Sequence, residues 1–347
     1  QKNQITFITH SLAGGGSEHV LTIIANYFAT HGYEVTIISR THKNNQYSID
    51  SHIDVQYVET KSHLIFLRRS RQIIRNIKPN TVISFEYFYN MCAVLICLGL
   101  NVKLLISERN DPARVGSGFI KSRIRNILYS FADVLICQTD DAKNYFPDYI
   151  RKKVFIILNP IMSGLPSKQE KVRDKVIVNF CRLNKQKNIP LLISAFEEFC
   201  NIHPDYELHI YGDGAEKETI LDIIYSKHLE RIIKVFPNTP NVHELVINAA
   251  MFVSTSDFEG LSNSMLEALS MGLPTICTDC PCGGARMVIE DGVNGFLIPV
   301  NNQKSLVDKM LLIAGSSELT IKLSNNALKI NNKLNVDNIC KQWISLL

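Results

Sequence analysis

Short apolar runs rich in β-branched residues alternate along this chain with longer stretches in which apolar residues recur at helical spacing. Strands buried in a parallel sheet have the first pattern, so the alternation predicts a doubly wound α/β fold. In the first half we expect strands at 5–9, 34–39, 55–58, 81–84, 103–107, 133–137 and 154–158, with helices such as 17–30 and 64–77 between them.

The alternation stops at residues 159–161, Asn-Pro-Ile, and a stretch rich in Pro, Gly, Ser and Lys follows to about residue 174. That composition is typical of an interdomain linker. The pattern then resumes, with strands expected at 175–181, 206–211, 232–236, 251–254 and 274–278, and helices at 189–201, 215–225, 242–248, 262–271 and from 303 onward. A chain of 347 residues fits two such domains.

Charge divides unevenly between the two halves. Residues 1–160 contain 19 basic and 12 acidic side chains, a net charge of +7, whereas the remainder contains 18 and 21, a net charge of −3. We therefore expect the first half to meet an anionic partner. No apolar run reaches the roughly 18 residues of a membrane helix, the start lacks a signal-peptide layout, and the nine cysteines lack a regular spacing. These features predict a cytoplasmic protein with reduced thiols.

The strongest chemical signal is a pair of glutamates eight positions apart, Glu259 and Glu267, across a predicted strand-to-helix junction. Gly260 lets a ligand approach the backbone, and Ser262 or Asn263 is a good helix N-cap. The free N–H groups of such a helix start bind a diphosphate well. Glu267 could then accept hydrogen bonds from ribose hydroxyls and Glu259 from sugar hydroxyls. An ordinary helix with a favourable acidic first turn explains the same pattern without a ligand.

A basic segment at 182–187 follows the first strand of the second half. Ligands of open α/β sheets bind at the carboxyl ends of the strands. Arg182 and Lys187 would place two positive charges there, where they could bind a diphosphate and stabilise it as it leaves with additional negative charge. A solvated basic loop is the alternative interpretation.

Three consecutive glycines at 14–16 follow the first strand and lead into a predicted helix, which allows a ligand to approach a helix N-terminus. The spacing is not the G-x-G-x-x-G of dinucleotide-binding folds. The second strand also ends in Ser39 and Arg40 rather than in the acidic residue that binds ribose in NAD enzymes. A dinucleotide site is therefore not indicated.

Together these segments resemble glycosyltransferase family four, the retaining enzymes of the two-domain GT-B fold. Glu259 and Glu267 match the family's E-x7-E element, residues 267–274 its EA-x-x-x-G-x-P stretch, and residues 291–297 its DG-x-NG-x-L stretch. The family pattern is also matched by Arg182, Lys187 and the Tyr-Gly-Asp-Gly segment at 211–214. The Ser-Glu-Arg-Asn-Asp-Pro segment at 107–112 resembles the branch that builds bacterial O-antigen, capsule and exopolysaccharide units.

The resemblance implies an α/β, GT-B architecture of two doubly wound, parallel-sheet, Rossmann-like domains that face a central cleft. Residues 1–160 would form the acceptor-binding domain and residues 161–333 the nucleotide-sugar-binding domain. Residues 334–347 would form a C-terminal helix that packs back on the first domain.

The resemblance also implies the site. Catalytic roles would fall to Glu259, Arg182, Lys187 and Glu108. The donor would be bound by Gly15, Gly16, Arg182, Lys187, Gly212, Phe236, Pro237, Glu259, Gly260, Leu261, Ser262, Asn263 and Glu267. Glu108, Arg109 and Asp111 occupy the region where many relatives place a histidine or aspartate, and they would bind the acceptor. One departure is Met287, which follows Arg286 where many relatives have a glutamate.

The implied activity is transfer of a hexose or N-acetylhexosamine from a UDP-sugar to an oligosaccharide, itself carried on a polyprenyl diphosphate, with formation of an α-glycosidic bond. No nucleophile stands out, so we favour a front-face route in which the leaving diphosphate accepts the proton of the acceptor. No D-x-D motif is present, so no cofactor or essential metal is expected.

A GT-B sugar-nucleotide 2-epimerase and a non-catalytic partner subunit that binds a sugar nucleotide or lipid remain alternatives. A nucleic-acid partner is excluded because basic and aromatic residues do not interleave.

Two segments combine basic and apolar residues at helical spacing. The first, 61–78, contains Arg68, Arg69, Arg71 and Arg75, and the second, 119–131, contains Lys121, Arg123 and Arg125. Helices of this kind lie on anionic membrane surfaces, which here would be the cytoplasmic face of a bacterial inner membrane. The alternative is that the apolar face of each helix belongs to the core and its basic face is merely solvated.

Overall fold

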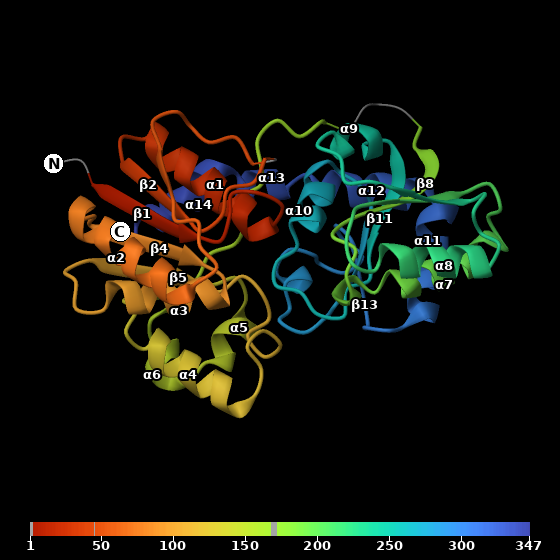
Figure 1. Ribbon diagram of the computed structural model, residues 1–347. Helices are drawn as coiled ribbons and strands as arrows, with labels where there is room; N and C mark the ends of the chain where they lie inside the picture. The colour runs from red at the N-terminus through yellow and green to blue at the C-terminus, as the bar shows by residue number, and fades with distance from the viewer. Residues whose placement is uncertain (1–2, 45, 168–171) are drawn as a thin grey trace. The chain divides into compact units, whose positions relative to one another are not determined.

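The computed structural model describes residues 3–44, 46–167 and 172–347, which are arranged in two compact units (Figure 1). Unit 1 comprises Gln1–Pro160 together with Leu334–Leu347, and unit 2 comprises Ile161–Lys333. Each unit is built on its own parallel sheet. None of the helices in the described part of the chain is both long enough and apolar enough to span a bilayer.

Unit 1 contains a seven-stranded sheet in the order β3-β2-β1-β4-β5-β6-β7. Its strands are β1 (Gln4–Thr9), β2 (Glu34–Ser39), β3 (Asp54–Tyr57), β4 (Thr81–Phe85), β5 (Lys103–Ser107), β6 (Val134–Cys137) and β7 (Val154–Ile156). Its helices are α1 (Gly16–Thr30), α2 (His63–Ile77), α3 (Tyr87–Cys97), α4 (Phe119–Tyr129), α5 (Asp140–Tyr145), α6 (Asp148–Arg151) and α14 (Val336–Ile344). Chain order reverses between the paired strands β1 and β4, whose carboxyl ends are therefore the expected ligand edge.

Unit 2 contains a six-stranded sheet in the order β10-β9-β8-β11-β12-β13. Its strands are β8 (Asp174–Phe180), β9 (Glu207–Tyr211), β10 (Ile233–Phe236), β11 (Ala249–Ser254), β12 (Thr275–Thr278) and β13 (Phe296–Ile298). The helices are α7 (Ile189–Cys200), α8 (Lys217–Ser226), α9 (Val242–Val246), α10 (Asn263–Ser270), α11 (Gln303–Gly315), α12 (Ser317–Ala327) and α13 (Ile330–Leu334), with 3-10 turns η1 (Lys185–Lys187) and η2 (Ala285–Met287). Here the order reverses between the paired strands β8 and β11.

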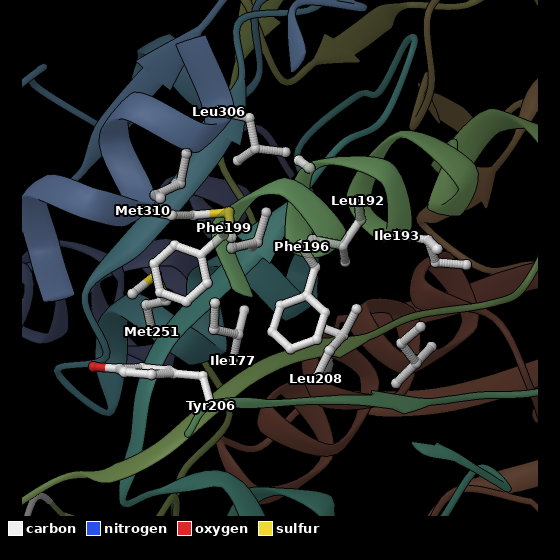
Figure 2. Packing of buried hydrophobic residues seen from close by; sticks show 14 of the residues in the cluster. Ile177, Leu192, Ile193, Phe196, Phe199, Tyr206, Leu208, Met251, Leu306 and Met310 are labelled. Carbon is white, nitrogen blue, oxygen red and sulfur yellow. The ribbon is translucent and has the colours of Figure 1, made fainter. Parts of the chain in front are cut away.

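The core of unit 2 lies between its sheet and the helices α7 and α11. Figure 2 shows Phe196 and Phe199 of α7 beside Ile177 of β8, Met251 of β11 and Met310 of α11. Each of these side chains is fully buried. Burial of one such side chain stabilises the fold by roughly 1.5–3 kcal/mol, so this cluster anchors the neighbouring strands β8 and β11.

The predicted strands agree with the observed ones to within a few residues, because strands covered on both faces show continuous apolar runs. All six residues of β11, for example, are buried. Helix α3 was not predicted. Seven of its 11 residues are buried, so it lacks the polar face by which an amphipathic helix is identified. The short elements α5, α6 and β13 were not predicted either.

The last helix belongs to the core of unit 1. Trp343 of α14 is fully buried, and its ring stacks on Phe85 of β4 with centroids 5.5 Å apart. At the start of the same helix, Asp337 accepts a hydrogen bond of 2.6 Å from the hydroxyl of Tyr27 in α1. The chain thus returns to unit 1 after completing unit 2.

We expect Trp343→Ala to lower the free energy of unfolding of unit 1 by about 3–5 kcal/mol, because it removes a large, fully buried side chain. The control Trp343→Phe should cost about 1 kcal/mol. This is because the indole Nε1 has no hydrogen-bond partner among the described residues, so only packing is lost. Urea unfolding followed by circular dichroism measures both variants. Equal destabilisation by the two would contradict a role in packing.

Candidate active site

Two loops of unit 2 lie against each other at the carboxyl ends of the adjacent strands β8 and β11. The Oγ1 atom of Thr255 is 3.0 Å from the carbonyl oxygens of both Lys187 and Asn188. The backbone N–H of Asp257 donates to the carbonyl of Gln186 at 2.8 Å. The basic segment and the segment of Glu259, 72 residues apart in sequence, therefore form one hydrogen-bonded platform.

An ion pair joins the two motifs that the sequence indicated. The ammonium group of Lys187 lies 2.5 Å from Oε2 of Glu259, and the side chains are 14% and 21% exposed. The hydroxyl of Ser256 donates to the same carboxylate oxygen at 3.2 Å. Burial by itself would lower the pKa of Lys187, but the neighbouring Glu259 carboxylate raises it, so the amine stays charged.

The second glutamate has a histidine partner that the sequence analysis missed. Glu267 lies in α10, whose N-cap is Ser262, with the backbone N–H of Met265 donating to its Oγ at 3.4 Å. Nε2 of His243 in α9 lies 3.0 Å from Oε2 of Glu267, and each side chain is 15% exposed. The imidazole therefore holds the carboxylate at the first turns of α10. No motif spacing relates the two residues, so only the fold reveals the pair.

Two glycines let loops of unit 2 touch at the backbone. A Cβ on Gly212 would lie 2.0 Å from the carbonyl oxygen of Cys181, which begins the basic segment. A Cβ on Gly284 would lie 1.6 Å from the carbonyl oxygen of Gly260. Only a residue without a side chain fits at either place. Gly212 was predicted to belong to the site, whereas Gly284, which supports the predicted Gly260, was not.

A small pocket opens beside these groups. It is bounded by Glu259, Gly260 and Ser262, and its other side is lined by Cys277 and Cys280. Burial raises the pKa of the Cys280 thiol to about 12 and that of Cys277 further. Both thiols therefore stay protonated at neutral pH and present small, uncharged surfaces to the pocket.

The remaining predicted donor residues of unit 2 lie on the same edge of the sheet. Arg182 is exposed at the start of the basic segment, and Leu261 is buried directly after Gly260. Asn263 is the first residue of α10. Phe236 ends β10 half-buried and stacks on Tyr211 with ring centroids 4.8 Å apart, and the following Pro237 is exposed.

In unit 1 the predicted glycines form the start of α1. Gly15 is the N-cap and Gly16 the first helical residue. The carboxylate of Glu18 lies against them, because a Cβ on Gly15 would be only 1.8 Å from its Oε2. A glutamate three positions into a helix commonly reaches back in this way to the N-cap. Because Gly15 has no side chain, the carboxylate of Glu18 fits beside it.

Glu86, which was not predicted from the sequence, follows β4 at the edge where the strand order of unit 1 reverses. Its backbone has φ +74°, a conformation uncommon outside glycine. Its carboxylate accepts a hydrogen bond from the hydroxyl of Ser17 in the glycine-rich start of α1. Strained backbone of this kind is concentrated at functional sites. A single glutamate before a helix gives no sequence signal.

The three residues predicted to bind the acceptor have partners within unit 1. Glu108 is 2% exposed and accepts a hydrogen bond of 2.8 Å from Tyr129. Arg109 donates to the side chain of Asn159. Asp111 is buried and accepts from the backbone N–H of the residue two positions on at 2.9 Å. These contacts fix the loop after β5, and the acceptor role of its residues stays a prediction.

We expect Gly284→Ala to destabilise unit 2 by about 1–3 kcal/mol, because its methyl group would displace the Gly260 carbonyl. Gly315→Ala is the matched control, since a Cβ there would meet nothing within 4 Å; it should be neutral or slightly stabilising. Thermal unfolding of the two variants measures the difference. A Gly284→Ala protein as stable as the control would contradict the close approach.

The environment of Glu108 also predicts that the stability of the folded protein depends on pH. Burial raises its pKa from 4.5 to about 7, although the Tyr129 hydroxyl acts in the opposite direction. The folded state therefore binds this proton more tightly than the unfolded state. The contribution of Glu108 to stability is accordingly lost as the pH rises from about 4.5 through about 7.

Glu108→Gln should remove this decline, and the exposed Glu59→Gln should preserve it. Melting temperatures of the two variants and of the unsubstituted protein between about pH 5 and pH 8 test this. Parallel profiles for Glu108→Gln and the unsubstituted protein would contradict the raised pKa.

The chain matches two family models, "Glycosyl transferases group 1" over residues 165–330 and "Glycosyltransferase Family 4" over residues 14–162. An alpha-1,4-N-acetyl-D-galactosaminyltransferase of Campylobacter jejuni, whose named acceptor is a diNAcBac-PP-undecaprenol glycan, is 24% identical over 99% of this chain and 98% of its own. The amylovoran biosynthesis glycosyltransferase AmsD of Erwinia amylovora is 23% identical over 96% of both chains.

Solved structures agree on the fold. The crystal structure of Anabaena HepE in complex with UDP has a TM-score of 0.84 with 18% identity, and the match covers 99% of this chain and 98% of that one. The family models confirm the predicted family, and the solved structure confirms the predicted fold. The chain belongs to the family 4 glycosyltransferases of GT-B fold, in the branch of bacterial polysaccharide enzymes.

Proposed function

We propose that this glycosyltransferase moves a hexose or N-acetylhexosamine from a UDP-sugar to an oligosaccharide on a polyprenyl diphosphate, with retention and formation of an α-glycosidic bond. The observation that carries the donor half of the proposal is the Lys187–Glu259 pair beside the start of α10. The UDP complex of HepE supports uridine diphosphate as the carrier. The acceptor named for the Campylobacter enzyme supports a lipid-linked glycan.

The geometry of unit 2 suits a nucleoside diphosphate. Lys187 and Arg182 supply positive charge on one side, and the N-terminal N–H groups of α10 supply donors on the other. Glu267, held by His243, is placed to accept hydrogen bonds from ribose hydroxyls. Phe236 offers an aromatic surface for the base.

The ion pair suggests how the donor sugar is recognised. In the structure Glu259 balances the charge of Lys187. A bound diphosphate is itself negatively charged and would replace Glu259 as the ion-pair partner of Lys187. The Glu259 carboxylate could then accept hydrogen bonds from sugar hydroxyls. The charge on this largely buried lysine is then balanced in both states, as a desolvated cation requires.

For the transfer step we propose a front-face route. The acceptor oxygen forms the new bond to the anomeric carbon on the side from which the diphosphate departs, and a departing phosphate oxygen takes the acceptor's proton. Arg182 and Lys187 stabilise the charge that develops, by ~3–4 kcal/mol each if they act like single oxyanion donors. These cations are side chains, so the proposal requires no metal, and complete loss of activity in EDTA would contradict that part.

For unit 1 we propose that the acceptor binds at the reversal of strand order between β1 and β4, where Glu86 follows β4. Its carboxylate could accept a hydrogen bond from an acceptor hydroxyl in exchange for that of Ser17. Glu108, which follows the neighbouring strand β5, is then a second carboxyl group, and it is tied to Tyr129. Catalytic participation by Glu108 would require that hydrogen bond to open.

Stabilisation by nucleotides tests the donor site. A ligand at 100-fold its Kd adds ~2.7 kcal/mol to the stability of the protein, so UDP and one UDP-sugar should raise the melting temperature by several degrees. Lys187→Gln and Glu267→Gln should abolish this shift. Glu259→Gln should keep the shift from UDP, because the diphosphate replaces the missing negative charge, but should lose the additional shift from the sugar. Lys175→Gln, at an exposed ion pair with Asp205, is the control.

Activity measurements complete the test. Lys187→Ala should lower turnover on the order of 100-fold or more, as loss of one such donor does elsewhere, and near-normal turnover would exclude its role. Absence of any nucleotide shift would favour the non-catalytic partner subunit. Conversion of the sugar nucleotide without an acceptor would favour the epimerase.

A further inference from the structure

Helix α4 of unit 1, in yellow in Figure 1, exposes its apolar residues. Four large hydrophobic side chains of the helix are at least half exposed: Phe119 75%, Ile120 72%, Ile124 50% and Ile127 56%. Phe131, two residues beyond the end of the helix, is 58% exposed. At about 3.6 residues per turn the four helical members lie within one broad arc of the helix surface. Contiguous apolar patches of this kind mark interaction surfaces.

The opposite side of α4 is anchored by a buried arginine. Arg125 is fully buried, and its Nη1 donates to the carbonyl of Pro112 at 2.7 Å. Its guanidinium lies over the rings of Tyr145 and Phe146, 4.9 Å and 5.2 Å from their centroids. These contacts hold the helix with its charged residue inward and its isoleucines outward. The alternative that the apolar face of this segment is core is therefore wrong.

The segment that carries the apolar arc is itself basic. Arg114, Lys121 and Arg123 are exposed, and residues 112–132 contain no aspartate or glutamate. Self-association through this face would bring these cations against the same cations of a second copy, with no acidic residue of the segment to balance them. The charge therefore fits an anionic occupant better than a second copy of the chain.

We propose that the α4 surface, defined as residues 119–131, docks on an anionic lipid bilayer. Phe119, Ile120 and Ile124 would enter the boundary between headgroups and acyl chains, while Lys121 and Arg123 would contact lipid phosphates. The proposal rests on the proposed function only in that a lipid-carried acceptor is found at such a surface. It specifies which helix provides the membrane contact.

The other basic helix, α2, is different. Its buried residues are Phe66, Ser70 and Ile74, so part of its apolar face does belong to the core. Its exposed apolar residues, Leu64 and Ile65, lie together at its start. The two segments look alike in sequence, but the structure gives α4 the larger free apolar face.

Co-sedimentation with phosphatidylglycerol–phosphatidylethanolamine vesicles, compared with phosphatidylcholine vesicles, tests the proposal on the full chain. Ile124→Gln/Ile127→Gln should weaken binding at least tenfold. Lys121→Gln/Arg123→Gln should weaken it roughly 10- to 25-fold, at about fivefold per basic residue, and should remove the preference for anionic lipid. The matched control is Leu312→Gln/Ile321→Gln, which replaces two exposed aliphatic residues of unit 2.

Unchanged melting temperatures would show that the α4 variants fold, since the replaced side chains are exposed. Stabilisation by UDP should also be unchanged, which separates membrane docking from the donor site. The proposal is overturned if the unsubstituted protein does not bind anionic vesicles, or if the α4 variants bind as well as the control. Loss of a dimer in the isoleucine variant, measured by sedimentation equilibrium without lipid, would instead assign this face to a second copy.

Discussion

A largely buried lysine must keep a negative partner, and the candidate site of unit 2 is organised around that requirement. Lys187 comes from the loop after β8 and Glu259 from the loop after β11, so the pair exists only because these strands are neighbours. Thr255 joins the two loops, and Gly284 leaves room for the Gly260 carbonyl. These contacts keep the Lys187 ammonium close to the Glu259 carboxylate. That proximity matters because an unpaired desolvated charge costs several kcal/mol.

Ionisable groups that are buried in unit 1 also need polar partners, and Arg125 and Glu108 are two examples. Arg125 donates to the carbonyl of Pro112 and lies over two aromatic rings, and Glu108 is held by Tyr129. The inward arginine determines the rotation of α4 and thereby turns its isoleucines outward. A basic, apolar surface on this unit and the proposed diphosphate-binding edge of the other would suit an enzyme that takes a nucleotide sugar from water and an acceptor from a membrane.

The sequence predicted the strands well and several helices poorly, for one physical reason. Buried parallel strands such as β11 are short, continuous apolar runs, which stand out against polar connections. Helix α3 is apolar on nearly all sides, so its helical period is hidden. His243, Gly284 and Glu86 could not be found because their significance is a contact with a residue distant in the chain: Glu267, Gly260 and Ser17.

The sequence by itself determined the family and the two-sheet architecture, and it supplied the motifs that we propose for the donor, because these depend on local residue types and fixed spacings such as that of Glu259 and Glu267. The tertiary structure decided which charges meet, which carboxyl groups are buried and which amphipathic face stays free. Segments 61–78 and 119–131 have similar patterns, yet one buries apolar residues and the other exposes them. Burial depends on what packs against a helix, and a local pattern contains no information about that partner.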